Sequence, residues 1–510
     1  MHEVCLENLR RFHTSQPFRK SAKSPNKEPE IQTNQKHHMF YRNHLMLQHE
    51  AADPAETRAG WTRDALFRAL DERFTFTDEI TRSFAADVFW RCVLPKIQPP
   101  TGLIKGRWMA PGGLYYGNPN AYDNCYIWDT AFMVDVLSWL PGGNEIVLEV
   151  MENYWDWQRQ RDAVVPEDMA WRRGAVNGPS HTATSYGMPA GTQNPLFAWA
   201  VLRCHRHASN LELVRRALPS LDAWHEWIWR ERSLDGSGLC VLGNYSGSLQ
   251  GARDEQGYDV SCDTDDMGLM PHPARPDGPA HYGDMWAVGF TSYVIKDEEC
   301  FVELAELAGE TALADKWRAR VEKAKTSMRE RLWNEEKGTF CNRFVKSGTW
   351  VETVTIGSWM PLYAGVPTEE QAKRMAATLA TPEWMTPLPM PTVGRTDPKW
   401  ECGTMGFLPD PPKHIDHLGQ AYNFWRGDVW PPTSYHAAAG LQRYGYHDLA
   451  ARICDATIMN AIRWGDVNER YCCDTGKPLG VPDYGMSACV FAMMTDGMTR
   501  RFGAKALTGH

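Results

Sequence analysis

From Trp61 onward, apolar residues recur at spacings of three and four along most of the chain. This spacing places apolar side chains on one face of a helix, so it predicts amphipathic helices. Two such segments, 62–72 and 78–93, come first. Further helices are predicted at 128–140, 144–160, 196–207, 211–230, 284–307, 311–332, 368–379, 433–444, 446–464 and 484–501. A short hairpin and a helix are predicted within 338–363.

Long polar and aromatic loops separate many of these helices, at 97–124, 166–191, 239–281 and 381–420. No segment shows the alternation of strands and helices that a parallel α/β fold requires. Loops longer than the usual four to six residues are commonly functional. About a dozen helices with long loops at alternate junctions predict an all-α fold. We expect an (α/α)6 toroid, a ring of helical hairpins whose loops gather at one mouth.

Residues 1–60 differ from the rest, because they are polar, contain Lys and Pro, and carry few apolar side chains. Such a segment cannot bury enough surface to fold alone. We predict a disordered extension here, with Met39 and Met46 as alternative starts of the chain. Residues 61–505 are expected to form a single (α/α)6 domain.

Charge and composition exclude several classes of partner. The 510 residues carry a formal net charge of −9 and no run of 18 apolar residues. Neither nucleic acid nor membrane is therefore an expected partner. The first residues lack the apolar stretch of a secretory signal. The 13 cysteines are irregularly spaced without a CxxC pair, which argues against disulfides and metal sites and favours a reducing cytoplasm. No phosphate-binding glycine motif is present, and we expect no cofactor.

The chain contains 22 Trp residues, spread along its length. The simplest explanation is a large core that needs bulky side chains. A second explanation is stacking on sugar rings, for which Trp offers a flat face and one N–H donor. This second explanation gains weight only where a Trp lies beside a polar motif.

The acidic side chains raise the question of catalysis. Glu469 lies in a turn-rich stretch, 465–480, between two predicted helices. Glycoside hydrolysis needs two carboxyl groups that flank the scissile bond. An acidic run at 254–266 could supply the second group. A loop Glu is more often a solvated surface charge, and the acidic run could equally be a solvated loop or a set of calcium ligands.

Other candidate residues surround aromatic motifs. In the segment 423–430, Arg426 lies between Trp425 and Trp430, where it could recognise hydroxyl groups or pair with a structural Asp. Trp128 and Asp129 could bind a sugar, or Asp129 could cap a helix. Gln193 could be a turn amide or a hydroxyl ligand.

The order of these motifs is more informative than any one of them. YIWDTAF at 126–132 is followed by GTQNP at 191–195, the acidic loop, FWRGDVWPP at 424–432 and NERYCCDTGKPLG at 468–480. Over about residues 110–500 this order resembles the inverting (α/α)6-barrel glycosidases of glycoside hydrolase family 63. That family includes processing α-glucosidases and mannosylglycerate and glucosylglycerate hydrolases, and it is related to the family 37 trehalases.

The resemblance implies roles for individual residues. Glu469 matches the general base that activates water. The general acid falls at Asp254 if GARDEQ is the matching motif, with Asp259 in reserve, whereas a match through YSGSL would place Leu249 there and remove the acid. Sugar-binding positions are implied for Tyr126, Trp128, Asp129, Gln193, Trp425, Arg426 and Trp430.

The expected activity is inverting hydrolysis of an α-glucoside or a related small α-glycoside, with water as nucleophile. The two carboxyl groups should then lie about 6.5–9.5 Å apart. The alternatives are a trehalase-like hydrolase, an epimerase or lyase on the same toroid, and a sugar-binding protein without catalysis. A glycerate aglycone would need a basic partner, for which Arg395 and Arg173 are candidates. The sequence indicates neither the sugar nor the oligomeric state.

Overall fold

A computed structural model describes residues 56–112, 124–187, 191–245, 247–259, 261–403 and 425–507. The chain divides into two units, Met1–Phe40 and Tyr41–His510. The first unit and most of the predicted extension lie outside the described residues. The described residues all belong to the second unit.

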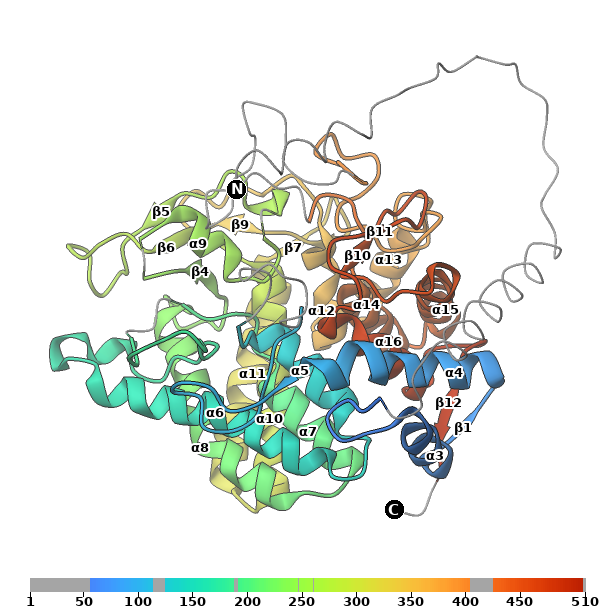
Figure 1. Cartoon of the computed structure of the whole chain (residues 1–510). Helices are drawn as coiled ribbons and strands as arrows, with labels where there is room; N and C mark the ends of the chain where they lie inside the picture. Colours follow the sequence, from blue (N-terminus) through green and yellow to red (C-terminus); the bar gives the residue numbers. More distant parts are fainter. Residues whose placement is uncertain are drawn as a thin grey trace, which may run out of the picture. The chain divides into compact units, whose positions relative to one another are not determined.

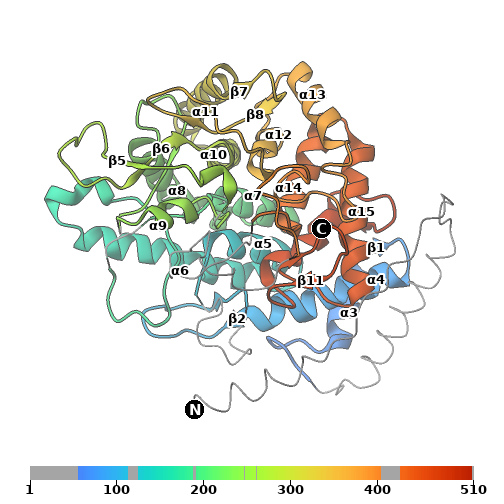
Figure 2. The same ribbon diagram turned by 90° about the horizontal axis from the view of Figure 1, so that it is seen from above.

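Six helices of the described residues form an inner ring (Figures 1 and 2). Each helix contacts the next along the chain, and the last contacts the first, so the ring is closed. This closure confirms the predicted (α/α)6 architecture. The inner helices are α5 (Ile127–Leu137), α7 (Phe197–His207), α10 (Val288–Ala308), α12 (Met360–Ala364), α14 (Pro431–Arg443) and α16 (Cys489–Thr495).

An outer helix precedes or follows each inner helix, which gives the hairpins of the toroid. The first, α4 (Glu79–Asp87), continues into a π-helix at Val88–Val93 that contacts α5. A short helix, α3 (Arg63–Arg73), packs against α4. The remaining outer helices are α6 (Gly143–Val164), α8 (Leu211–Glu231), α11 (Thr311–Arg331), α13 (Glu369–Leu379) and α15 (His447–Trp464).

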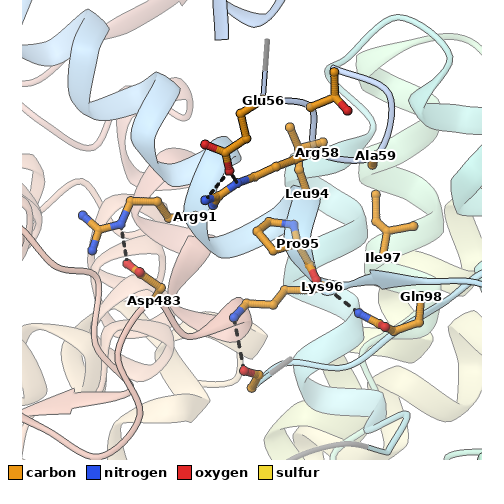
Figure 3. A pocket seen from close by; sticks show the side chains of 12 residues that line it. Glu56, Arg58, Ala59, Arg91, Leu94, Pro95, Lys96, Ile97, Gln98 and Asp483 are labelled. Carbon is orange, nitrogen blue, oxygen red and sulfur yellow. Dashed lines mark hydrogen bonds and ion pairs between the residues drawn. The ribbon is translucent and has the colours of Figure 1, made fainter. Parts of the chain in front are cut away.

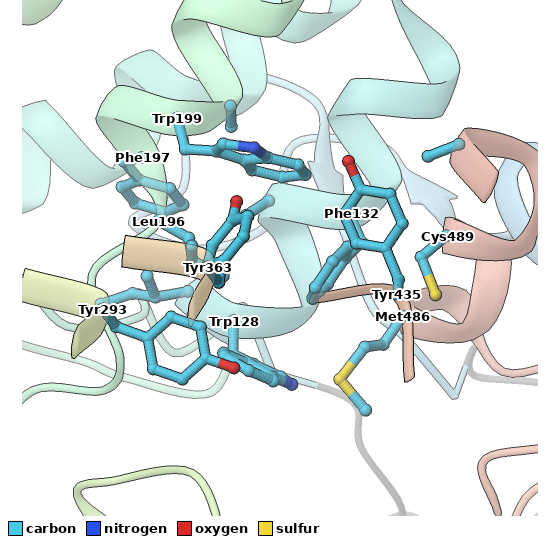
Figure 4. Packing of buried hydrophobic residues seen from close by; sticks show 14 of the residues in the cluster. Trp128, Phe132, Leu196, Phe197, Trp199, Tyr293, Tyr363, Tyr435, Met486 and Cys489 are labelled. Atoms are coloured by element: carbon cyan, nitrogen blue, oxygen red, sulfur yellow. The ribbon is translucent and has the colours of Figure 1, made fainter. Parts of the chain in front are cut away.

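The inner helices are largely buried, as the apolar character of their sequences requires. Every residue of α5 is buried. Aromatic side chains from α5, α10, α12 and α14 meet in the centre of the ring (Figure 4). Trp128 packs edge-on against Tyr293 at 4.9 Å, and Tyr363 stacks on His436 at 4.3 Å between ring centroids. This packing fixes Trp128 at the start of α5, where it borders the cavity described below.

Short antiparallel strands replace parts of the predicted loops. One sheet has the order β4-β6-β5, with β9 paired to β6. The prediction that 239–281 is only a loop and that a helix begins at Asp284 is therefore wrong: α10 begins at Val288, after a strand. The sheet consists of β4 (Val241–Gly243), β5 (Leu269–Met270), β6 (Tyr282–Trp286) and β9 (Arg343–Phe344).

The remaining strands pair in twos and tie loops and termini together. β1 (Phe74–Phe76) pairs with β12 (Ala504–Ala506), which brings the two ends of the toroid together. β10 (Arg470–Tyr471) and β11 (Pro478–Leu479) form a hairpin directly after Glu469. The other pairs are β2 (Ile97–Gln98) with β3 (Trp108–Met109), and β7 (Trp333–Asn334) with β8 (Thr339–Phe340).

The last predicted helix, 484–501, is shorter than expected. A 3₁₀ turn at Gly485–Ala488 leads into α16, which ends at Thr495. Gly497 has a φ of 68°, a left-handed conformation that stops a helix. In the described part of the chain, no helix combines the length and the apolar character needed to cross a membrane.

Candidate active site

A cavity of about 150 Å³ lies at the N-terminal ends of four inner helices, α5, α7, α14 and α16. Tyr126 directly precedes α5, Trp430 directly precedes α14, and Tyr484 precedes the turn that leads into α16. The starts of these three inner helices thus meet at one cavity, as expected for a toroid whose loops gather at one mouth. The cavity is lined by Tyr126, Trp128, Asp129, Gln193, Asp254, Gly257, Asp259, Trp425, Trp430, Glu469, Tyr484 and Met486.

Eight of the nine predicted site residues are in this lining, and the ninth, Arg426, is not. They come from positions up to 343 residues apart in the chain, since Tyr126 and Glu469 meet here. Four carboxyl groups share the cavity, those of Asp129, Asp254, Asp259 and Glu469.

Glu469 is 2% exposed and is held by the hairpin that follows it. Its backbone N–H donates to the Val481 carbonyl at 2.9 Å, and the Val481 N–H donates back to the Glu469 Oε2 at 3.0 Å. Gly480 has a φ of 72°, and a Cβ there would lie 2.0 Å from the Glu469 Oε2. Only glycine leaves room for the carboxyl group, which gives the PLG end of the motif a physical role.

The two most distinctive motifs lie side by side. Val429 and Tyr471 exchange backbone hydrogen bonds of 2.8 and 2.9 Å. Asp428 and Arg470, both buried, form an ion pair. Residues adjacent to these, Trp430 on one segment and Glu469 on the other, therefore face the same cavity from fixed backbones.

Arg426 is 1% exposed and pairs with Asp265 rather than lining the cavity. Its Nη1 lies 3.1 Å from the Asp265 Oδ2. Asp265 also accepts a hydrogen bond of 2.8 Å from Arg253. The carboxyl of Asp265 thus links Arg426 to Arg253, the residue directly before Asp254. A buried guanidinium needs such a partner, so this pairing favours a structural role for Arg426 over the predicted sugar binding.

Asp254 is the last residue of α9 (Leu249–Asp254), a helix capped by the Ser248 side chain. The Gln250 amide donates to the Asp254 Oδ1 at 2.8 Å. The next residue, Glu255, is buried and pairs with Arg232 at 2.6 Å, which anchors the end of α9. Leu249 is 39% exposed and does not line the cavity. The alternative match, with Leu249 at the acid position, therefore does not fit this arrangement.

Asp129 is buried beside a second carboxyl group. Burial raises the pKa of Asp129 to about 7, the Tyr484 hydroxyl lowers the pKa by hydrogen bonding, and the nearby Glu469 raises it further. Among the described residues, the Asp129 Oδ1 and the Trp128 Nε1 have no hydrogen-bond partner although both atoms are buried. Unpaired buried polar atoms are costly, so these two are available to a ligand with hydroxyl groups.

Aromatic rings form one wall of the cavity. Trp425 and Trp430 stack with 4.0 Å between ring centroids and 8° between planes. Tyr258 packs against Trp425 at 4.9 Å and holds the pair from behind. Stacked rings next to carboxyl groups suit a ligand with both an apolar face and hydroxyl groups. The volume is below the ~300 Å³ of pockets for drug-sized ligands, which suits a single small ring.

The Gln193 side chain holds the start of α5, which carries Trp128. Its Oε1 accepts a hydrogen bond of 2.7 Å from the backbone N–H of Ile127, the first residue of α5. The adjacent Thr192 N–H donates to Glu255, which is next to Asp254. The GTQNP segment thus connects the start of α5 with the end of α9.

Sequence reasoning missed Tyr484, Met486 and Gly257 as lining residues. Tyr484 was included only as the start of a predicted helix, and its hydrogen bond to Asp129 has no signal in the sequence. The two candidate cations for a glycerate group are paired outside the cavity, Arg395 with Asp474 and Arg173 with Glu167.

The acidic side chains of residues 254–266 do not gather into one site, because several of them have separate partners. Glu255 pairs with Arg232, Asp263 accepts hydrogen bonds from Asn342 and Thr355, and Asp265 pairs with Arg426. Within the described residues, no group of three or more His, Cys, Asp or Glu side chains has an arrangement that could hold a metal ion.

Most of the chain matches a known protein family. Residues 122–487 match the family described as the mannosylglycerate hydrolase MGH1-like glycoside hydrolase domain. The chain is 25% identical to mannosylglycerate hydrolase of Rubrobacter radiotolerans over 341 residues, which cover 58% of this chain and 71% of that protein. It is 26% identical to mannosylglycerate hydrolase MGH1 of Selaginella moellendorffii over 327 residues. That match covers 57% of this chain and 62% of that protein, less than two thirds of its length.

The fold also matches a solved structure. The GH63 mannosylglycerate hydrolase from Thermus thermophilus, in complex with Tris and D-glycerate, aligns with a TM-score of 0.59 and 19% identity. The alignment covers 81% of this chain and 99% of that one. At this level of identity the likeness concerns the fold.

Proposed function

This chain belongs to the mannosylglycerate hydrolase MGH1-like glycoside hydrolase family, and we propose that it hydrolyses a small α-glycoside with inversion at the anomeric carbon. The preferred substrates are α-mannosyl or α-glucosyl conjugates of a small acid such as glycerate, because the relatives are named mannosylglycerate hydrolases. Trehalose is the alternative substrate.

One observation carries this proposal: the cavity joins four carboxyl groups to a stacked pair of Trp rings. The rings offer an apolar surface to one face of a sugar ring. The buried, unpaired Trp128 Nε1 and Asp129 Oδ1 provide a donor and an acceptor for sugar hydroxyls. A carboxyl pair then supplies the acid and the base that glycoside hydrolysis requires.

Glu469 is the proposed general base. It removes a proton from a water molecule as the water oxygen attacks the anomeric carbon. The hydrogen bond from the Val481 N–H and the close contact of Gly480 keep its carboxylate in one orientation. A fixed base is effective because the geometry of proton transfer is set before the reaction begins.

Asp254 is the proposed general acid. It donates a proton to the glycosidic oxygen as the bond to the anomeric carbon breaks, so the leaving group departs as a neutral alcohol. Asp254 is only partly buried and lines the same cavity as Glu469. Asp259 is the other carboxyl that can take this role. We expect the acid and base carboxyls to be about 6.5–9.5 Å apart when substrate and water are bound.

The experiment uses substrates that differ in their need for an acid. The fluoride ion of a glycosyl fluoride leaves without being protonated. The glycerate oxygen of mannosylglycerate needs a proton before it leaves. We expect Asp254→Asn to lower kcat on mannosylglycerate about 10²–10⁴-fold but to retain activity on α-mannosyl fluoride. Glu469→Gln should lower kcat by a similar factor on both substrates, because water must be activated in either case.

Asp259→Asn is the matched control, since it removes a neighbouring carboxyl from the same cavity. If Asp259→Asn alone shows selective loss on the glycerate conjugate, Asp259 is the acid and the assignment to Asp254 is wrong. Full turnover by Glu469→Gln would overturn the proposed mechanism. Sugar binding without hydrolysis of any tested α-glycoside would identify a binding protein instead.

A further inference from the structure

The turn between the π-helix and β2 borders a cavity of about 450 Å³ (Figure 3). Its two guanidinium groups are already paired with carboxylates. Arg58 lies 2.9 Å from the Glu56 Oε1, and the Arg91 Nε lies 2.9 Å from the Asp483 Oδ1. Arg58 also donates to the Trp90 carbonyl at 2.8 Å. These contacts hold the segment before α3 and Asp483 against the π-helix, and this structural role accounts for both groups.

Another cavity, of about 270 Å³, lies among four inner helices, α7, α10, α12 and α14. Its lining comes from within α7 and α14, whereas the active site takes Gln193 and Trp430, which precede these two helices. The 13 residues of α14 span about 20 Å, so Arg443 at the end of the helix lies far from Trp430. We call this second space the rear cavity, and its lining includes Trp199, Arg203, Arg206, Lys296, Tyr363 and Arg443.

Packed aromatic side chains separate the rear cavity from the active site (Figure 4). Trp128, which lines the active site, packs edge-on against Tyr293. The Tyr293 hydroxyl lies 3.0 Å from the His436 Nδ1, and His436 stacks on Tyr363, which lines the rear cavity. The two cavities have no lining residue in common, so they are separate sites.

The Tyr363 hydroxyl is a buried polar group of the rear cavity. Tyr363 is 5% exposed, and within the described residues its Oη has no hydrogen-bond partner. In Figure 4 this hydroxyl points away from Trp128 and toward Trp199, which also lines the rear cavity. The Tyr435 hydroxyl differs, because it donates to the Asp496 Oδ2 at 2.8 Å. Burial raises the pKa of Tyr363, so the phenol keeps its proton and is available as a donor to a ligand.

Every cation of this lining has a carboxylate partner. The pairs are Arg203 with Asp496, Arg206 with Glu303, and Lys296 and Arg443 with Glu299. These cations therefore offer no unpaired charge to an anion. The paired groups still present N–H donors and carboxylate oxygens. A neutral hydroxyl group can bond to either kind of group, because it both donates and accepts hydrogen bonds.

We propose that the rear cavity binds a neutral polyhydroxyl molecule, a monosaccharide or a cyclic polyol, through the Tyr363 hydroxyl and the paired charges around it. The Tyr363 O–H donates to one hydroxyl of the ligand, and Arg443 and Glu299 bond to others. The volume exceeds that of the active-site cavity and is close to the ~300 Å³ at which ligand pockets begin, which suits a single ring. The inference is independent of the proposed hydrolysis, because it uses none of the residues of the active site.

Titration calorimetry of the full-length protein tests this site with two neutral probes, D-mannose and myo-inositol, which represent a sugar and a cyclic polyol. We expect saturable binding of at least one probe. Tyr363→Phe removes only the hydroxyl, and the loss of one hydrogen bond should weaken binding about fivefold. Tyr446→Phe is the matched control, because Tyr446 directly precedes α15 and lies outside the rear cavity. This control should leave binding unchanged.

Ala439→Leu tests the same site by filling space without a change of charge. Ala439 lines the rear cavity from α14 and is partly exposed, so the larger side chain should weaken binding tenfold or more. Binding of either probe at the active site should be alike in all these proteins, so the difference between their isotherms reports the rear cavity. If circular dichroism shows that Ala439→Leu does not fold, the comparison of Tyr363→Phe with Tyr446→Phe decides alone.

Inorganic phosphate serves as the charged probe in the same titrations. Because the cations of the rear cavity are already paired, phosphate binding should not differ between the unaltered protein and Ala439→Leu. Phosphate binding that Ala439→Leu abolishes would contradict the neutral class of ligand. Absence of saturable binding for both neutral probes, or equal binding by the unaltered protein and by Tyr363→Phe, would overturn the proposed site.

Discussion

Gly480 sets the position of the Glu469 carboxyl, so it offers a test at the scale of one residue. An added Cβ would lie 2.0 Å from the Glu469 Oε2, and the φ of 72° disfavours any other residue. We expect Gly480→Ala to lower kcat by at least tenfold and to destabilise the fold by more than the ~1–2 kcal/mol of left-handed strain. Steady-state kinetics and chemical unfolding measure the two effects.

Gly497→Ala is the control for this substitution. Gly497 has a similar φ of 68°, and a Cβ there would meet no atom within 4 Å. Gly497→Ala should lower the free energy of unfolding by the backbone strain alone and leave kcat unchanged. Equal kinetic behaviour of the two variants would mean that the contact between Gly480 and Glu469 does not position the carboxyl.

Asp129 predicts a dependence of stability on pH. Its pKa rises from 3.8 to about 7 on folding, chiefly through burial. Below about pH 4 the carboxyl is protonated in both states, and no penalty arises. Between about pH 4 and 7 the unfolded chain releases the proton while the folded protein keeps it. The contribution of Asp129 to the free energy of unfolding therefore falls by up to ~1.4 kcal/mol per pH unit, about 4 kcal/mol in all.

Urea unfolding of the unaltered protein and of Asp129→Asn, at several pH values from 4 to 8, measures this contribution. The stability of Asp129→Asn relative to the unaltered protein should rise between pH 4 and 7 and then stay level. A constant difference across this range would show that the carboxyl ionises alike in both states.

At the scale of elements, the segment 425–430 is held in place from two sides. Val429 pairs with Tyr471 of β10, and Arg426 pairs with Asp265. We expect Arg426→Met to cost about 2 kcal/mol of stability, because it removes charge-assisted hydrogen bonds from a buried guanidinium while Asp265 keeps its hydrogen bond from Arg253. Chemical unfolding measures this loss. The KM of the variant that remains folded should change little.

Arg206→Met is the surface comparison, since Arg206 is largely exposed in its pair with Glu303. It should cost less than about 1 kcal/mol. If Arg426→Met keeps full stability and raises KM strongly, Arg426 contacts the sugar and the structural role given to it here is wrong.

The helices were predictable because their apolar spacing is long and regular. The capping sequence at Thr368, with Gln371 three residues later, marks the start of α13 in both sequence and structure. The strands were not predictable, because segments of two to five residues such as β5 and β6 show too little alternation. The π-helix at Val88–Val93 also shares its apolar pattern with an ordinary helix.

At the scale of the whole molecule, the toroid explains why residues distant in sequence share one cavity. Four inner helices, α5, α7, α14 and α16, bring residues at or just before their starts to the same cavity, so motifs placed before these helices converge. Motif order therefore predicted most of the lining. It could not predict that Arg426 turns to Asp265 or that Tyr484 bonds to Asp129, because both depend on side-chain packing between distant segments.

The stereochemistry of the product tests the central claim most directly. A proton NMR time course of mannosylglycerate, glucosylglycerate and trehalose hydrolysis, recorded before mutarotation, identifies the anomer that forms first. Because water activated by Glu469 attacks the face opposite the leaving group, an α-linked substrate should yield the β-sugar first. Initial release of the α-sugar would contradict the account, since it requires a covalent intermediate on a carboxylate and not a base acting on water.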